Sequence, residues 1–288
     1  MRLDARAALQ CHEFLHKSFA PGCFDLTDRA DESEMMRELK RQGDIHEART
    51  IEYLHTLGLE IHTISKDQGE NENERETAKA LLNSTAQIIL GACISSTCER
   101  VISDVTGIDT SSSIRVSRPD VLIRVGEGAD GKPRWAPVDI KSHDPINENK
   151  SSKLYLAKWD SFLPTDGVEI VARLDLDDAA QLAHYHEHLR TLGIATDEGF
   201  VGVIGRDIET IAWAKLSETA LGLGGKAGDA GTDYLVKFDI AKKIVAAAQA
   251  RQKDPALPPA AYSALESDAK FGCGACTFQI VCERELKN

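Results

Sequence analysis

The chain has 288 residues, of which 42% are apolar, so it is long enough for one large domain or two small ones and can bury a substantial core. Its net charge of −12 argues against a broadly basic surface for tight, nonspecific binding of nucleic acid, although a groove neutralised by metal ions is compatible with this charge. No run approaches the roughly 18 apolar residues of a membrane span, and the N-terminal MRLDARAALQ lacks the apolar core of a secretory signal, so we expect a cytoplasmic protein with no membrane partner.

The N-terminal part of the sequence predicts helices followed by a strand. Residues 5–19 and 32–58 are expected to be helical, and Gly58 would end the second helix. Apolar residues recur at near-helical spacing in this second helix: Leu39, Ile45, Ile51, Leu54 and Leu57. Leu59–Ile64 predicts a strand, and the polar DQGENENERE predicts a loop that leads into a helix over about 74–90. Residues 95–113 favour neither helix nor strand.

The middle of the sequence contains a clear hairpin pattern. SIRVSRPDVLIRV alternates like a strand, GEGADGKP has the composition of a turn with Asp130-Gly131 at its centre, and WAPVDIKSH predicts the returning strand. The polar HDPINENKSSK that follows predicts a mobile loop.

The C-terminal part predicts a helix, two strands and a further helix. DLDDAAQLAHYHEHLRTLG has aspartates at its start and Gly193 at its end, as helices often do. GFVGVIG and ETIAWAKL predict strands, GLGGKAGDAG a glycine-rich loop without the phosphate-loop pattern, and 232–252 a helix. The order of elements indicates a mixed sheet flanked by helices, of α/β or α+β class, in a single domain over residues 1–288.

Two carboxylates and a lysine are expected to converge on the hairpin. Asp139 and Lys141 are two residues apart on a strand, so both side chains should lie on one face, while Val138 and Ile140 should point into apolar packing. Asp120 lies on the partner strand. Adjacent carboxylates repel each other unless a cation lies between them, and Mg²⁺ is a natural candidate. Such a site suits phosphodiester hydrolysis, because a metal ion activates water and a lysine stabilises developing charge.

Three polar residues elsewhere are candidates for the same site. Gln181 and Tyr185 are four apart on a predicted helix, so they share a face and either contact phosphates or bases or simply form its polar rim. His46 lies seven residues from Leu39, on the side expected to face the core, and is either a satisfied core histidine or a metal ligand.

RPDVLI, PVDIKS and QLAHY, in that order, resemble the RecB-like branch of the PD-(D/E)xK nucleases, and GDIHEA resembles the histidine motif of that branch. The resemblance covers about residues 1–288, with weak stretches at 65–110 and 215–260, and it implies a restriction-endonuclease-like core. It also implies that His46, Asp120, Asp139 and the carbonyl of Ile140 bind Mg²⁺ or Mn²⁺.

The same resemblance assigns roles to three further residues. It implies that Lys141 is the catalytic lysine, and that Gln181 and Tyr185 form the Gln-x-x-x-Tyr motif, which contacts DNA and supports the site. The acidic residue before the lysine is Asp139, where glutamate is also common in this branch.

Three cysteines lie close together near the C-terminus, in the pattern Cys273-x2-Cys276-x5-Cys282. A tetrahedral metal site or a cubane cluster needs a fourth ligand, for which Cys11 and Cys23 are candidates. RecB-like nucleases with an iron–sulfur cluster carry one early cysteine and a C-terminal trio. That resemblance implies a 4Fe–4S cluster that joins the two termini, and it favours Cys11 because QCHEFLHK has the helical context of the family's early cysteine.

Zinc is the main alternative to the cluster, with His12 or His16 in place of one cysteine. Cys93 and Cys98 have no partner pattern and are interpreted as core or surface thiols. The spacing of His184 and His188 would suit zinc, but without an accompanying acid they are interpreted as a polar helix face.

These patterns favour a Mg²⁺- or Mn²⁺-dependent DNA nuclease acting on single strands or ends, in repair or recombination. No Walker A motif is present, so any unwinding would need a helicase partner. One alternative is a non-catalytic nucleic-acid-binding or scaffold protein that keeps the nuclease fold and cluster, which the acidic charge favours. Another is a zinc-stapled interaction module unrelated to nucleic acid.

Overall fold

A computed structural model describes residues 2–27, 29–83, 85–110, 114–219, 229–257 and 276–285. The chain divides into two compact units. We call Met1–Ala5 with Gln42–Tyr234 the sheet unit, and Arg6–Arg41 with Leu235–Asn288 the terminal unit. Compact units of one chain can still fold together, so the single domain expected over 1–288 stays a prediction.

The sheet unit is built on a mixed sheet of eight strands in the order β1-β2-β3-β4-β7-β8-β5-β6. The pairs β1/β2 and β4/β7 are parallel, and the other neighbours are antiparallel. The strands are β1 Ile61–Thr63, β2 Ile88–Leu90, β3 Val121–Glu127, β4 Pro133–Ile140, β5 Ile146–Lys158, β6 Val168–Leu174, β7 Phe200–Ile204 and β8 Thr210–Lys215. The prediction of an α/β protein with a mixed sheet flanked by helices is confirmed.

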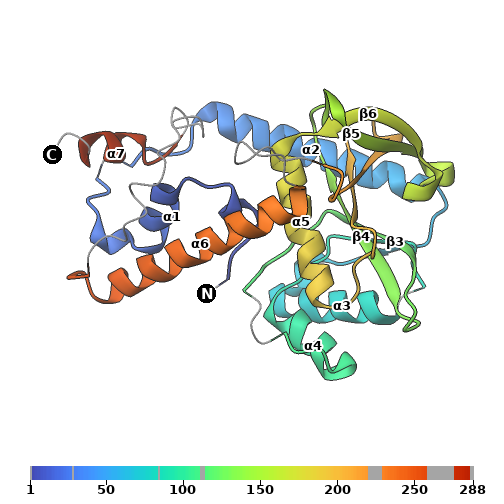
Figure 1. Cartoon of the computed structure of the whole chain (residues 1–288), viewed down its shortest axis with the longest axis horizontal. Coiled ribbons are helices and arrows are strands. Elements are labelled where there is room, and N and C mark those ends of the chain that lie inside the picture. Colours follow the sequence, from blue (N-terminus) through green and yellow to red (C-terminus); the bar gives the residue numbers. More distant parts are fainter. Residues whose placement is uncertain are drawn as a thin grey trace. The chain divides into compact units, whose positions relative to one another are not determined.

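Helices lie in both units (Figure 1). The α-helices are α1 His12–Phe19, α2 Glu34–Thr56, α3 Glu70–Asn83, α4 Ser96–Thr106, α5 Leu176–Thr191, α6 Ala230–Lys253 and α7 Gln279–Glu285. Short 3-10 helices are η1 Ala5–Ala8, η2 Pro21–Cys23, η3 Lys66–Gln68, η4 Trp159–Ser161 and η5 Pro164–Asp166. Among the helices of the described residues, we find none with both the length and the apolar character needed to cross a membrane.

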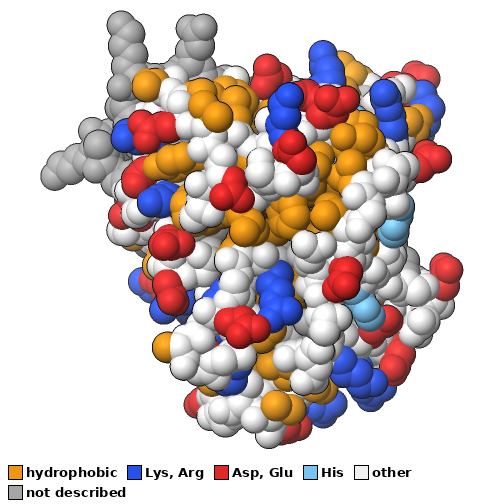
Figure 2. All heavy atoms as spheres, turned by 90° about the vertical axis from the view of Figure 1, so that its right-hand side faces the viewer, with side chains coloured by type: hydrophobic (Ala, Val, Ile, Leu, Met, Phe, Trp, Pro, Cys, Tyr) orange, Lys and Arg blue, Asp and Glu red, His pale blue; other side chains and the backbone are white. Residues whose placement is uncertain are grey.

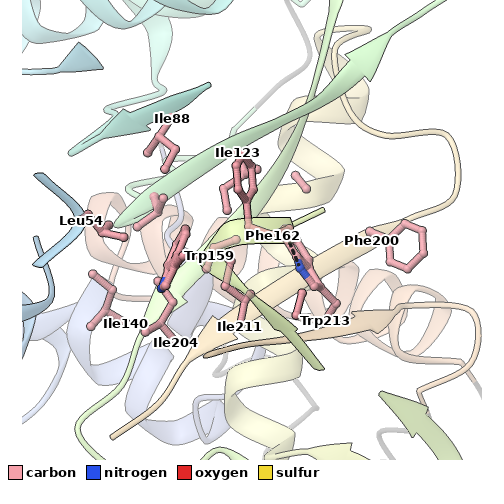
Figure 3. Close-up of a cluster of buried hydrophobic side chains, with 14 of the residues drawn as sticks. Leu54, Ile88, Ile123, Ile140, Trp159, Phe162, Phe200, Ile204, Ile211 and Trp213 are labelled. Carbon is pink, nitrogen blue, oxygen red and sulfur yellow. Dashed lines mark hydrogen bonds between the residues drawn. The ribbon is translucent and has the colours of Figure 1, made fainter. Parts of the chain in front are cut away.

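The sheet buries an apolar cluster on each face. One cluster joins Leu54 of α2 to β2, β3, β4, β7 and β8, with Trp159 and Trp213 among its largest members (Figure 3). The other packs α3, α4 and α5 against the opposite face around Trp135. Buried indole N–H groups need acceptors. Nε1 of Trp213 donates to the carbonyl of Phe162 at 2.9 Å and Nε1 of Trp135 to that of Leu81 at 3.1 Å.

The hairpin of β3 and β4, the helix α5 and the strands β7 and β8 match the sequence predictions, but the helix boundaries before them do not. The helix predicted over 74–90 is instead α3 followed by β2, because the acidic residues from Glu70 onward form the first turn of the helix, where the dipole favours negative charge. The undecided stretch 95–113 contains α4, which ends at Gly107 with a left-handed φ of 73°.

The prediction of a mobile loop after β4 was wrong. This stretch contains the start of β5, which pairs with both β6 and β8. Polar residues can occupy this strand because it carries a register shift between Glu148 and Lys153 and belongs to the outer part of the sheet. The strand β6, which the sequence did not predict, forms that edge.

Two details of the N-terminal helices also differ from expectation. Residues 5–19 do not form one helix: η1 ends at Ala8, and Cys11 is the N-cap of α1. In α2, Leu39 and Ile45 are 56% and 49% exposed, whereas Leu54 is fully buried. The apolar spacing therefore predicted buried residues correctly near Leu54, which packs on the sheet, and incorrectly at Leu39 and Ile45.

The terminal unit brings residues from both ends of the chain together. The rings of Phe14 in α1 and Phe278 before α7 meet edge to face with centroids 5.3 Å apart. The guanidinium of Arg29 lies over the ring of Phe278 at 4.8 Å, and the amide of Ala30 donates to the carbonyl of Thr277 at 3.0 Å. The two segments that carry Cys11 and Cys276 thus pack within one unit.

Surface charge is mixed on the face shown in Figure 2. Basic and acidic side chains lie interspersed around a band of apolar side chains. Because neighbouring opposite charges cancel at short range, this face does not present the single-sign field that attracts a polyanion.

Candidate active site

The hairpin places Asp120 opposite Asp139. Val121 pairs with Val138 in the antiparallel ladder, so the residue before β3 lies across from the residue after Val138. Oδ2 of Asp120 accepts a hydrogen bond from the amide of Ile140 at 2.8 Å, which fixes its carboxylate at the end of β4. The sequence had placed Asp120 on the strand itself, whereas β3 begins one residue later.

The alternation expected along β4 is confirmed. Val138 and Ile140 join the apolar cluster on one face of the sheet. Asp139, which is 1% exposed, therefore points to the opposite face, where α5 packs.

The proximity of the two carboxylates changes the pKa of Asp120. Burial, and then the adjacent Asp139, raise the pKa of Asp120 well above its ordinary value, and Glu47 of α2 raises it further. Oδ2 of Asp139 is buried and has no hydrogen bond of acceptable geometry within the described part of the chain. The Nζ of Lys141 forms an ion pair with this oxygen at 2.6 Å. When both acids are ionised, one ammonium group beside the buried Asp139 and the half-buried Asp120 leaves negative charge in excess.

Lys141 is held by three side chains. Besides the ion pair with Asp139, its Nζ lies 3.4 Å from Oδ1 of Asp178 and donates to Oε1 of Gln181 at 2.9 Å. Burial alone would lower the pKa of Lys141, but the carboxylates of Asp139 and Asp178 outweigh it, so the pKa is raised. The lysine is therefore a cation at neutral pH.

Gln181 and Tyr185 extend this network along α5. Nε2 of Gln181 donates to the hydroxyl of Tyr185 at 2.8 Å, as expected for residues one turn apart. Burial, followed by the charge of Asp139, raises the pKa of Tyr185, so its hydroxyl stays protonated. The helix is positioned at its start by Asp175, whose side chain caps it by accepting from the amide of Asp177 at 2.9 Å.

His46 lies beside the next strand. Its Nε2 is 3.1 Å from the carbonyl oxygen of Gly205, which directly follows β7, and β7 is the parallel neighbour of β4. The amide of Lys141 donates to the carbonyl of Ile204 at 2.8 Å, so the ends of these two strands are tied together. His46 is thus brought to the same edge of the sheet as Ile140 and Lys141.

Three residues at this edge were not assigned to the site from the sequence. Glu47 follows His46 and acts electrostatically on Asp120. Asp178 is 4% exposed and shares its carboxylate between Lys141 and His143, whose Nε2 lies 3.0 Å from Oδ2. Burial raises the pKa of Asp178, and the two basic neighbours oppose this rise. A signal was present for Asp178, because it lies three residues before Gln181 on the same helical face.

The interpretation of His184 and His188 as a polar helix face was wrong, because both are fully buried. His184 lies 2.7 Å from the hydroxyl of Tyr234 and 2.9 Å from the carbonyl of Val116. His188 lies 2.8 Å from the hydroxyl of Ser117 and 2.7 Å from Glu99, whose own carboxylate pairs with Arg2 at 2.7 Å.

Ser117, His188 and Glu99 form a hydrogen-bonded series like that of a hydrolase. All three are buried, so a substrate has no access to them. Hydrogen bonds occupy both nitrogens of each of the two rings, His184 and His188. These histidines therefore satisfy buried polar groups between α5 and its neighbours.

A different set of side chains has the spacing of metal ligands. Within the described ranges, the one group of three such residues with ligand atoms inside 4.8 Å of one another is Glu70, Glu74 and Cys93. Arg118 pairs with Glu70 and hydrogen-bonds Cys93, and Glu74 accepts from the amide of Thr97 at 2.7 Å at the start of α4. Burial raises the pKa of the Cys93 thiol. Arg118 thus balances the charge of Glu70, and the amide groups at the start of α4 balance that of Glu74.

The cysteines of the terminal unit are described in part. Cys273 lies outside the described residues, while Cys11, Cys276 and Cys282 are half-buried and not in disulfides. Sγ of Cys276 accepts a hydrogen bond from the amide of Phe278 at 3.4 Å. Cys23 differs, because its Sγ donates to the carbonyl of Arg251 at 3.3 Å. The predicted cluster stays a prediction.

Comparison of the chain with models of protein families, with curated proteins and with solved structures finds no match in any of the three. The function must therefore be inferred from the site itself. At one edge of the sheet the fold brings together Asp120, Asp139, Lys141, Gln181 and Tyr185, with His46 one strand away.

Proposed function

We propose that the chain is a Mg²⁺- or Mn²⁺-dependent nuclease of the RecB-like PD-(D/E)xK class that hydrolyses phosphodiester bonds in DNA. The observation that carries the proposal is the convergence of Asp120, Asp139 and Lys141 at the end of β4, with the lysine bonded to Gln181. These are the residues and the order that the sequence resemblance requires, and they come from segments that are up to 61 positions apart in the sequence, from 120 to 181.

A divalent cation suits the donor set of this site. Asp139 is buried beside the half-buried Asp120, and Oδ2 of Asp139 has the ammonium of Lys141 at 2.6 Å but no hydrogen bond of acceptable geometry among the described residues. Hard carboxylate oxygens are the ligands that Mg²⁺ and Mn²⁺ prefer. The resemblance adds the carbonyl of Ile140 and the imidazole of His46, although the ligand atoms of His46, Asp120 and Asp139 do not all lie within 4.8 Å of one another here and Nε2 of His46 contacts the carbonyl of Gly205. When bound, the ion would polarise the phosphodiester and lower the pKa of the attacking water.

Lys141 supplies positive charge rather than a base. Its raised pKa keeps the ammonium protonated, so it stabilises the negative charge that develops on the phosphoryl oxygens. Gln181 holds the ammonium on one side, and Tyr185 holds Gln181. Gln181 and Tyr185 thus hold the lysine side chain in place before the substrate binds, so its conformational entropy is lost during folding and not during the reaction.

The terminal unit is proposed to hold a 4Fe–4S cluster through Cys11, Cys273, Cys276 and Cys282. Two observations support this assignment. The segments around Cys11 and Cys276 pack together through Phe14 and Phe278, and an amide already donates to Sγ of Cys276, as is common for cluster thiolates. Cys23 is a weaker candidate, because its thiol hydrogen is engaged with a backbone carbonyl. Zinc remains the alternative occupant.

DNA, as single strands or ends, is the proposed substrate, and a helicase is the partner that would supply such strands from a duplex. The face in Figure 2 carries mixed charge, so it is not itself a broad basic face for DNA.

The test is cleavage of end-labelled single- and double-stranded DNA with Mn²⁺, using protein purified without air. Wild type should cut, Lys141→Ala should lose at least a hundredfold in rate, and Lys153→Ala, which removes an exposed lysine of β5, should cut like wild type. Retained cleavage in Lys141→Ala would refute the assignment. Tight DNA binding without cleavage by wild type over several metals would favour a non-catalytic binding protein.

A further inference from the structure

Two loops at the edge of the site run side by side. They follow the parallel strands β4 and β7, and the amide of Arg206 donates to the carbonyl of His143 at 3.2 Å. Nε and Nη2 of Arg206 both reach the carbonyl of Ser142 at 3.4 Å. A Cβ at Gly205 would lie 2.5 Å from Cδ of Pro145, so the loops can approach this closely only with glycine there.

His143 is oriented by a buried acid and still faces solvent. Its Nε2 is 3.0 Å from Oδ2 of Asp178, while its side chain is 51% exposed. A histidine ring has two nitrogens, so one can bond Asp178 and the other a ligand. The same carboxylate pairs with Lys141, so Asp178 connects the exposed imidazole to the half-buried lysine.

The basic groups at this edge differ in their surroundings. Lys141 lies among carboxylates, whereas His143 and Arg206 lie on the exposed rim, in loops joined to each other by backbone hydrogen bonds. A guanidinium and a histidine ring N–H can both donate hydrogen bonds to phosphate oxygens. A phosphodiester at Asp139 and Lys141 would leave the next phosphate of the chain to meet this rim.

We propose that His143 and Arg206 form a subsite for the phosphate next to the scissile one, which makes a polynucleotide chain the preferred substrate class. This inference rests on the proposed nuclease function. Asp178 is a positioning residue in it, because it aims His143 outward and holds Lys141 inward.

The experiment uses short fluorescent DNA strands in which one linkage beside the cleaved one is a neutral methylphosphonate. With wild type and Mn²⁺, the neutral linkage on one side should raise KM about fivefold, the effect of losing one exposed charge contact, with little change in kcat. The double variant that carries His143→Gln and Arg206→Gln should show that raised KM on the unmodified strand and no further rise on the modified one.

Lys79→Gln is the matched control, because it removes an exposed lysine of α3. It should respond to the methylphosphonate like wild type. If the KM of the double variant still rises when the linkage is neutral, or if its KM on the unmodified strand equals that of wild type, the subsite is refuted while the nuclease function stands. If wild type cuts no strand, the proposed function fails and the subsite with it.

Discussion

The buried His184 should make the sheet unit sensitive to acid. Its imidazole is 0% exposed, and burial lowers its pKa from 6.5 to about 3, although the carbonyl of Val116 partly opposes this. The folded state therefore binds fewer protons than the unfolded state between these two values. Stability is present above pH 6.5 and is lost as the pH falls towards 3. A shift of this size corresponds to about 5 kcal/mol when the whole window is crossed.

Urea unfolding followed by tryptophan fluorescence measures this loss. All three tryptophans, Trp135, Trp159 and Trp213, belong to the sheet unit, so the signal is specific to it. Between pH 6 and 4, unfolding of wild type should take up about one proton more than unfolding of His184→Gln, so the variant's stability should fall less steeply.

The control is His55→Gln, which changes an exposed histidine of α2 and should keep the wild-type slope. Because burial lowers the pKa of His186 and His188 as well, a residual slope should persist in the His184 variant. Equal slopes for wild type and His184→Gln would refute the reasoning, whatever the variant's stability at neutral pH.

Three further predictions concern the site and the cysteines. Asp178→Asn removes a carboxylate that raises the pKa of Lys141, so the alkaline limb of the cleavage rate should move to lower pH; an unchanged limb would contradict that role. Tyr185→Phe leaves the half-buried amide of Gln181 without its acceptor and should lower the free energy of unfolding by about 1 kcal/mol, measured by urea titration, and a loss near zero would show that this bond is dispensable. Cys11→Ser should reduce the iron content of anaerobically purified protein, whereas Cys23→Ser should not; the reverse pattern would reassign the fourth ligand.

Local patterns in the sequence predicted the elements that carry the site. A strand-like, alternating pattern around an Asp130-Gly131 turn predicted the β3–β4 hairpin, and the opposite faces of Ile140 and Asp139 followed from the period of a strand. Aspartates before an apolar stretch gave the start of α5. These features depend on neighbours within a few residues, so the sequence alone contains them.

Features that depend on distant neighbours were missed. The polar strand β5 is stabilised by pairing with β6 and β8, which no local pattern reveals. The burial of His188 depends on Glu99 and Ser117, which lie 89 and 71 positions away. Likewise, the role of Asp178 depends on a lysine in a different element, so helical spacing could suggest it but not establish it.

The most direct test of the account is Mn²⁺ binding, because it does not depend on choosing the right nucleic acid. Electron paramagnetic resonance titration should detect Mn²⁺ binding to wild type that weakens at least tenfold in Asp120→Asn and in Asp139→Asn, the two carboxylates that repel each other without a cation. Asp166→Asn, which changes an exposed acid outside the site, should bind like wild type. Equal Mn²⁺ binding by wild type and both site variants would contradict the claim that this pair of aspartates forms a metal centre.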